Sequence, residues 1–161
     1  MVPIVLWLVL DYWDFWGRFA ALVLLVLAAS TDGIDGAIAR KRNLVTNFGK
    51  LLDPIADKAL LTGSLLALSV QEAVPWVATG LILARELIVT GYRLVVARRQ
   101  VIAATGGGKF KTVMQIIAVS LALAPFEALG TWYLLFSQAV LWFTVVLTLW
   151  SGKQILWPSK L

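Results

Sequence analysis

The 161-residue sequence contains no cysteine and no histidine. The absence of cysteine excludes disulfide frameworks, thiolate metal sites and cysteine nucleophiles. The absence of histidine removes the commonest transition-metal ligand and the commonest general base. Any bound metal must therefore be held by oxygen atoms, which favours magnesium, manganese or calcium over zinc or copper.

Charged residues are also scarce in this chain. They make up 14% of the residues, whereas hydrophobic residues make up 60%. A soluble globular domain is about a quarter charged and about half apolar. The composition therefore predicts an integral membrane protein, and the length predicts a single transmembrane domain over residues 1–161.

The hydrophobic residues fall into six segments, which predicts an all-α bundle of six transmembrane helices. The first segment, Met1–Leu10, is too short to cross a bilayer, because a crossing helix needs about 20 residues. The other five helices are expected at about residues 17–40, 48–70, 75–97, 109–125 and 131–150. The longest expected connection, Arg98–Gly108, ends in three consecutive glycines.

Apart from the four aspartates considered next, basic and acidic residues near the segment ends lie on opposite sides. If the second segment ends in the cytoplasm, the cytoplasmic end carries Arg40, Lys41, Arg42, Lys50, Arg98, Arg99, Lys109, Lys111, Lys153 and Lys160. The other end carries Asp11, Asp14, Glu72 and Glu127, with Arg18 as its only basic residue. Cytoplasmic loops of membrane proteins are enriched in lysine and arginine. Topology thus explains the formal charge of +5, and we expect no nucleic-acid partner.

Four aspartates interrupt the second and third hydrophobic segments. Asp32 and Asp35 are three residues apart, and Asp53 and Asp57 are four apart. Residues at these spacings share one face of a helix. Carboxylates at membrane depth are costly unless they are paired, so they indicate a functional site. Four carboxylates without nitrogen or sulfur ligands suit two Mg²⁺ or Mn²⁺ ions, a recurring arrangement in phosphoryl chemistry.

Arg85 and Arg93, in the fourth segment, lie at depths similar to those of the aspartates. Charges of both signs therefore converge in the cytoplasmic half of the bundle. A polar, water-filled cavity open to the cytoplasm would keep them ionised at the lowest cost.

Several residues near the aspartates suit a phosphate or a nucleotide, and each has a plainer alternative. Gly36 permits close approach of a phosphate, although glycine more often serves helix packing in membranes. Arg40 suits a phosphate or an interfacial anchor, and Thr46 suits a nucleotide contact or a helix cap. For Arg85 the alternative is an ion pair with a buried acid such as Glu86. For Lys109 and Lys111 it is interfacial anchoring.

The aspartates belong to a longer pattern, D-x2-D-G-x2-A-R-x8-G-x3-D-x3-D, which begins at Asp32 and ends at Asp57. This pattern resembles the signature of the CDP-alcohol phosphatidyltransferase family at every fixed position. Within that family, three segments resemble the phosphatidylglycerophosphate synthases: DPIADK at 53–58, ARELIVTGYR at 84–93 and GKFKT at 108–112.

The resemblance implies a six-helix membrane enzyme, usually a homodimer, that transfers a phosphatidyl group from CDP-diacylglycerol to an alcohol and releases CMP. For the synthases the alcohol is glycerol 3-phosphate, and the product is phosphatidylglycerophosphate, a phospholipid precursor. The alternative within the family is another acceptor, such as phosphatidylglycerol, which would give cardiolipin, or inositol phosphate. A divalent-metal transporter is disfavoured, because Arg18 is the only ionisable residue in the outer halves of the segments.

The resemblance also assigns roles to individual residues. Asp32, Asp35, Asp53 and Asp57 would bind the metal ions, and Asp57 would also act as the base on the acceptor hydroxyl. Gly36, Arg40 and Thr46 would bind the CDP part. Arg85, Arg93, Lys109 and Lys111 would bind the phosphate of glycerol 3-phosphate. The partners would be both substrates, membrane lipids and a second copy of the chain, with the active site at the cytoplasmic face of the cell membrane.

The N-terminal segment gives the first testable prediction. Members of the family usually carry an N-x2-T-x2-R pattern in a first span, and ten apolar residues cannot form such a span. We expect the genomic reading frame to extend upstream of Met1 by a turn of helix or more and to encode this pattern. Sequencing the upstream region tests the expectation, and an in-frame stop codon directly before Met1 would contradict it.

Overall fold

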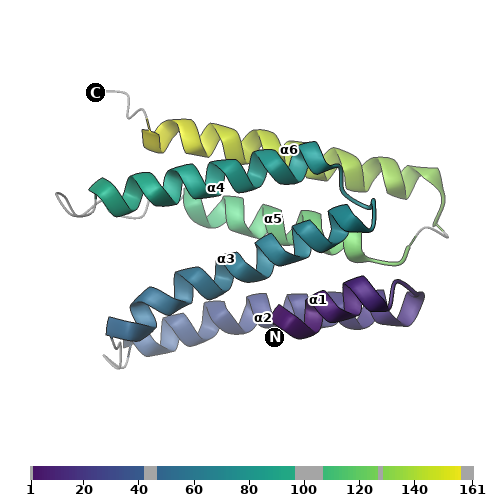
Figure 1. Ribbon diagram of the computed structural model, residues 1–161, viewed down its shortest axis with the longest axis horizontal. Coiled ribbons are helices and arrows are strands. Elements are labelled where there is room, and N and C mark those ends of the chain that lie inside the picture. The colour runs from purple at the N-terminus through teal and green to yellow at the C-terminus, as the bar shows by residue number, and fades with distance from the viewer. Residues whose placement is uncertain (1, 42–46, 97–106, 127–128, 157–161) are drawn as a thin grey trace.

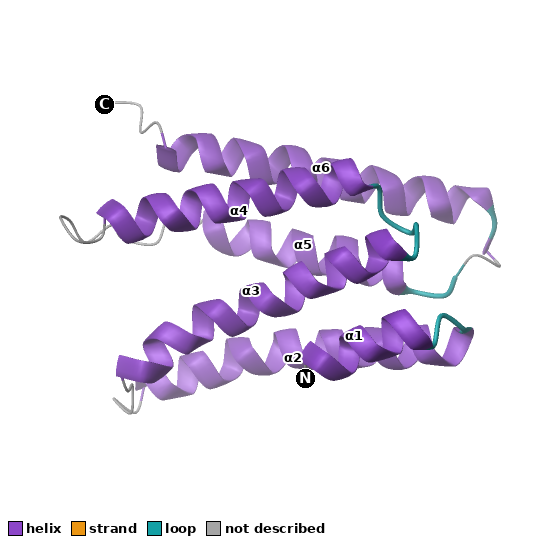
Figure 2. Ribbon diagram, in the orientation of Figure 1, coloured by secondary structure: helices purple, strands orange, loops and turns teal. Residues whose placement is uncertain are grey.

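The computed structural model describes the backbone of residues 2–41, 47–96, 107–126 and 129–156, and the side chains of residues 2–31, 58–92, 110–126, 129–153 and 155. This part of the chain contains six helices and no strand (Figure 2). The expected all-α, six-helix architecture is therefore confirmed. The helices are α1 Val2–Asp11, α2 Phe15–Lys41, α3 Asn47–Val70, α4 Trp76–Val96, α5 Gly107–Leu123 and α6 Thr131–Leu156.

The six helices pack as two groups that α3 and α5 connect (Figure 1). Helix α1 packs against α2 and α3, while α4 and α5 both pack against α6. Helix α5 also contacts α2 and α3, and α3 runs obliquely from the end of α2 toward the start of α4. The end of the bundle where α2, α4 and α6 finish and where α3 and α5 begin is called here the aspartate end. The opposite end, at the α1–α2 and α3–α4 connections, is called the distal end.

The core is built from leucine, valine and alanine contributed by all six helices. Leu25 of α2, Leu68 of α3, Leu123 of α5 and Leu141 of α6 are almost completely buried. Large apolar side chains also cover the outside, and on α6 they include Trp132, Leu135, Phe143, Val146 and Trp150. An apolar exterior of this extent is unusual for a soluble monomer.

Among the described residues, only the Thr131–Lys153 segment of α6 is both long and apolar enough to cross a membrane. Helices α2, α3 and α4 contain 27, 24 and 21 residues, so their length would suffice. Each of them, however, carries charged residues, including the four aspartates, Arg85 and Glu86. The residues that form the candidate site are therefore also those that weaken the apolar character of these helices.

Three helix boundaries differ from those expected. Helix α2 begins at Phe15 because Asp14 caps it, with the backbone N–H of Gly17 donating to Asp14 Oδ1 at 3.0 Å. Helix α5 begins at Gly107, so two of the three glycines expected in the connection are helical. Helix α6 continues beyond the expected end near residue 150 to Leu156, and this extra length becomes important at the site.

Side chains bond to backbone carbonyls across the distal end. Buried Arg18 of α2 donates from Nε to the carbonyl oxygen of Leu123 at 3.1 Å and from Nη2 to that of Ala124 at 3.0 Å. Its guanidinium also lies 4.5 Å from the ring centroid of Trp13, a cation–π distance. Gln71 in turn donates to the carbonyl oxygen of Val9 at 2.8 Å. Arg18 thus caps the C-terminal end of α5, which explains the one basic residue at this end.

Replacing Arg18 with alanine is expected to destabilise the fold. The change removes two charge-assisted hydrogen bonds to α5, and bonds to charged groups contribute about 1.5–3 kcal/mol each in general. Thermal unfolding in detergent should show a clearly lower midpoint for Arg18→Ala. The control is Lys153→Ala, which removes an exposed basic residue from α6. Equal midpoints for the two variants would contradict the capping role.

Candidate functional site

The signature aspartates lie on two continuous helices that pack against each other. Asp32 and Asp35 belong to α2, and Asp53 and Asp57 belong to α3. The helical periodicity on which the spacing argument depends is therefore present. The side chains of the four aspartates and of Arg40 lie outside the described residues. Of Gly36 only its position in α2 is described, and Thr46 lies outside the described residues altogether. The roles of these residues as metal and nucleotide ligands therefore stay predictions. Among the side chains that are described, no cluster of three or more acidic residues could hold a metal ion.

A cluster of charged side chains joins α3, α4 and α5. It consists of Lys58, Arg85, Glu86 and Lys111, and it is called here the basic cluster. Arg85 Nη1 donates to Glu86 Oε1 at 3.0 Å, and the Lys111 ammonium group pairs with the same carboxylate oxygen. Arg85 and Lys111 are buried, with 7% and 6% of their surfaces exposed. The basic cluster contains three cations and one carboxylate, so its formal net charge is +2 (3 − 1), and two of the cations pair with that carboxylate.

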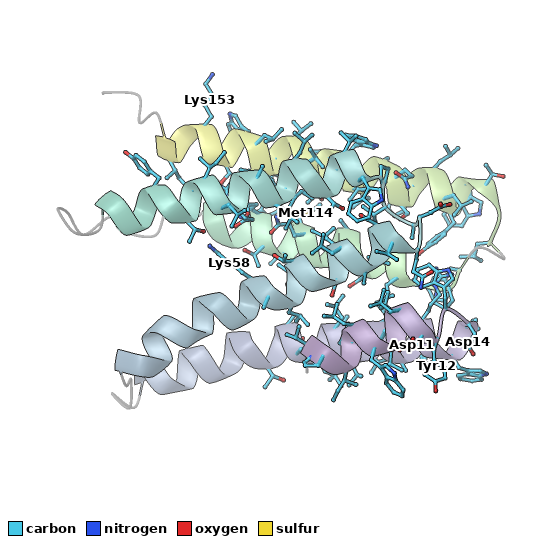
Figure 3. All side chains as sticks on the ribbon, in the orientation of Figure 1. Asp11, Tyr12, Asp14, Lys58, Met114 and Lys153 are labelled. Atoms are coloured by element: carbon cyan, nitrogen blue, oxygen red, sulfur yellow. The ribbon has the colours of Figure 1, made fainter. Side chains whose placement is uncertain are left out.

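Lys58 connects the basic cluster to the aspartate signature. It follows Asp57 directly in the chain, and its side chain extends from α3 toward α4, where it bonds to the hydroxyl of Thr90 (Figure 3). It also interacts electrostatically with Glu86 and Lys111. The cluster of positive charge therefore begins one residue after the last signature aspartate.

Helix α6 holds Arg85 from the other side. Arg85 Nη2 donates to Ser151 Oγ at 3.1 Å. A Cβ atom placed on Gly152 would lie 3.0 Å from Arg85 Nε and 3.1 Å from Arg85 Cγ, closer than ordinary van der Waals contact. The guanidinium is thus fixed between Glu86 of α4 and the Ser151–Gly152 step of α6. Arg85 Nε is buried and has no hydrogen-bond partner among the described groups.

The structure brings together two of the four residues expected to bind the acceptor phosphate. Arg85 and Lys111 meet at Glu86, and the ion pair with Glu86 that was the alternative for Arg85 is formed. Arg93 belongs to α4 and Lys109 to the first turn of α5, but their side chains lie outside the described residues. Arg85 and Lys111 together carry one more positive charge than the Glu86 carboxylate neutralises. The ion pair therefore leaves the capacity to bind an anion.

Sequence reasoning missed Lys58, Ser151 and Gly152 at this site. Lys58 ends the DPIADK segment, which contributed to the family resemblance, but no role was assigned to Lys58 itself. Ser151 and Gly152 gave no signal, because the expected helix ended one residue before them.

The sequence profile of the CDP-alcohol phosphatidyltransferases matches residues 1–150, which is most of the chain. The chain belongs to the CDP-alcohol phosphatidyltransferase family. The resemblance of the aspartate pattern to this family is thereby confirmed, and the protein is a phosphatidyltransferase.

Curated relatives of this phosphatidyltransferase carry more specific names. A CDP-diacylglycerol–glycerol-3-phosphate 3-phosphatidyltransferase of Bacillus subtilis is 41% identical over 170 residues, covering 96% of this chain and 86% of the relative. A Rickettsia felis protein of the same name is 40% identical over 137 residues, covering 84% and 76%. A probable phosphatidylglycerophosphate synthase of Mycobacterium tuberculosis is 46% identical over 108 residues, covering 67% of this chain and 52% of the relative.

Proposed function

We propose that this phosphatidyltransferase transfers the phosphatidyl group of CDP-diacylglycerol to glycerol 3-phosphate, giving phosphatidylglycerophosphate and CMP. Relatives that cover most of this chain are named for that reaction. The structural observation that carries the proposal is the basic cluster, which has a net charge of +2 and whose Lys58 directly follows the signature on α3. An acceptor with its own phosphate group complements that charge, whereas a neutral alcohol does not.

The residues of the signature fit a pair of Mg²⁺ or Mn²⁺ ions. Carboxylate oxygens are the donors that these hard cations prefer, and Asp32, Asp35, Asp53 and Asp57 supply four of them from two packed helices. When bound, two such ions would neutralise the diphosphate of CDP-diacylglycerol and stabilise the leaving CMP. Gly36, Arg40 and Thr46 are the proposed contacts to the CDP part.

The transfer itself requires one proton acceptor from the chain, and Asp57 is proposed for it. The acceptor oxygen forms a bond to the phosphatidyl phosphorus, the bond from that phosphorus to the CMP oxygen breaks, and the hydroxyl proton passes to Asp57. A positioned carboxylate in this role typically contributes 10²–10⁴-fold to the rate, as an order of magnitude for general bases.

Arg85, Arg93, Lys109 and Lys111 are proposed to bind the acceptor phosphate. Arginine offers planar, bidentate contacts to phosphate, and lysine offers a mobile point charge. Arg85 and Lys111 are already held near each other by Glu86. This arrangement places two cations at one location before the substrate arrives, which lowers the cost of ordering them on binding.

The proposed setting is the cell membrane, with residues 1–161 as a single multi-pass transmembrane domain. The apolar exterior supports this setting. Lys153 and the acidic residues Asp11 and Asp14 lie at opposite ends of the bundle (Figure 3). By the enrichment of basic residues on the inner side, the aspartate end would face the cytoplasm, and we propose that a polar cavity opens there. As in the family generally, the functional unit is proposed to be a homodimer, which mass measurement in detergent would test.

A single assay tests the proposed function. Purified protein is incubated with CDP-diacylglycerol and, separately, glycerol 3-phosphate, phosphatidylglycerol or inositol phosphate, and CMP release is measured with and without Mg²⁺. We expect release with glycerol 3-phosphate and Mg²⁺, and little release when either is omitted. Faster release with another acceptor would assign the chain to a sister reaction of the family.

A further inference from the structure

Helix α6 lies outside the aspartate signature, yet its last turns contact the basic cluster. Ser151 accepts a hydrogen bond from Arg85, and Gly152 leaves the space that the Arg85 side chain occupies. Ser151 and Gly152 are both buried, and both lie beside the side chain of Arg85, which is itself buried. This contact joins residues 66 positions apart in the sequence, and nothing in the signature motif accounts for it.

We infer that the Ser151–Gly152 step of α6 positions Arg85 for the acceptor phosphate and thereby sets the affinity for the acceptor. The inference rests on the proposed function, because it concerns the phosphate site of glycerol 3-phosphate. Ser151 and Gly152 are positioning residues, since they act on the substrate through Arg85.

The hydrogen bonds of Arg85 leave donors for a ligand. A guanidinium has five N–H groups, and the bonds to Glu86 and Ser151 use one on each terminal nitrogen. The Nε–H group has no partner among the described groups although it is buried. A buried donor without a partner is costly and calls for an explanation, such as a bound anion or water. Both terminal nitrogens of Arg85 are thus held by hydrogen bonds, while its remaining N–H groups can still donate to an anion.

Gly152 matters because Arg85 cannot move away easily. A methyl group at position 152 would lie 3.0 Å from Nε and 3.1 Å from Cγ, so both atoms would have to shift by a few tenths of an ångström. The far end of Arg85 is bonded on both sides, to Glu86 and to Ser151, so a shift would break or lengthen one of those bonds. Adding the methyl therefore alters the position of the guanidinium.

The test compares Gly152→Ala with Gly91→Ala. Both glycines are helical, but a Cβ atom at Gly91 of α4 would have no neighbour within 4 Å among the described residues. The initial rate of CMP release is measured while the concentration of each substrate is varied in turn. For Gly152→Ala we expect the KM for glycerol 3-phosphate to rise about tenfold, comparable to the loss of one well-formed charged hydrogen bond, with the KM for CDP-diacylglycerol unchanged within about twofold. Gly91→Ala is expected to match the wild type.

A second pair of variants keeps the inference testable if Gly152→Ala does not fold. Ser151→Ala removes the hydroxyl that accepts from Arg85 and is expected to raise the acceptor KM several-fold, whereas Ser151→Thr keeps a hydroxyl and should recover most of the affinity. Thermal unfolding midpoints are measured for all variants. In an enzyme that does use glycerol 3-phosphate, equal rises in both KM values, or no rise in any α6 variant, would overturn the positioning role alone. A wild-type enzyme that ignores glycerol 3-phosphate would overturn the proposed function instead.

Discussion

Asp57→Asn is expected to abolish turnover while CDP-diacylglycerol still binds and at least one metal ion stays in place. Asparagine has the size of aspartate and retains one oxygen ligand, but it cannot accept the proton of the acceptor hydroxyl. CMP release under saturating substrates measures the loss. Equilibrium binding of CDP-diacylglycerol and metal titration measure what is retained.

The other signature aspartates are the controls for this variant. Asp32→Asn and Asp53→Asn should weaken metal binding itself, so raising the Mg²⁺ concentration should restore part of their activity. The same treatment should not rescue Asp57→Asn. If Asp57→Asn kept more than about a tenth of the wild-type kcat, a loss of less than roughly 1.4 kcal/mol in activation free energy, the assignment of Asp57 as the base would be wrong.

Arg93→Ala is expected to raise the KM for glycerol 3-phosphate more than tenfold, with a much smaller change for CDP-diacylglycerol. A desolvated charge-assisted contact contributes about 1.5–3 kcal/mol, which corresponds to at least a tenfold change in affinity. Initial rates at varied concentrations of each substrate measure the two constants. Lys153→Ala, at an exposed position on α6, should leave both near the wild-type values.

Removing Arg85 would not probe the acceptor phosphate alone. Arg85 is bonded to Glu86 and Ser151, so its removal would disturb the packing of α4 against α6 as well as the phosphate site. If Arg93→Ala raised the KM values for both substrates to a similar extent, Arg93 would have a role in the fold and not in binding the acceptor.

The helices could be predicted from the sequence because hydrophobic segments and local signals mark them. Pro75 directly precedes α4, and α6 begins at Thr131 as expected. The start of α2 was placed two residues late because the capping role of Asp14 was overlooked. The end of α6 was placed too early because Ser151 and Gly152 are not apolar, and both pack against Arg85 of another helix, which the local sequence does not indicate.

Helical periodicity predicted the candidate site only where its residues are close in sequence, and Arg85 was grouped with Lys111 only through the family resemblance. The four-residue steps of the signature and the adjacent Arg85–Glu86 pair belong to single helices, whose periodicity is regular. Lys111 lies 25 residues from Glu86, and Ser151 lies 66 residues from Arg85. These contacts depend on how α4, α5 and α6 pack, and helical periodicity carries no information about that packing.

The two ends of the bundle should differ in how they tolerate sequence change. At the distal end, Arg18 and Gln71 donate to backbone carbonyls, which every amino acid provides, so Leu123 and Val9 can be exchanged for other apolar residues without losing the bonds. In the basic cluster both partners of each bond are side chains, so a change at Glu86 leaves Arg85 and Lys111 without their shared acceptor. Homologous sequences are therefore expected to drift independently around Arg18 and to change in concert around Glu86.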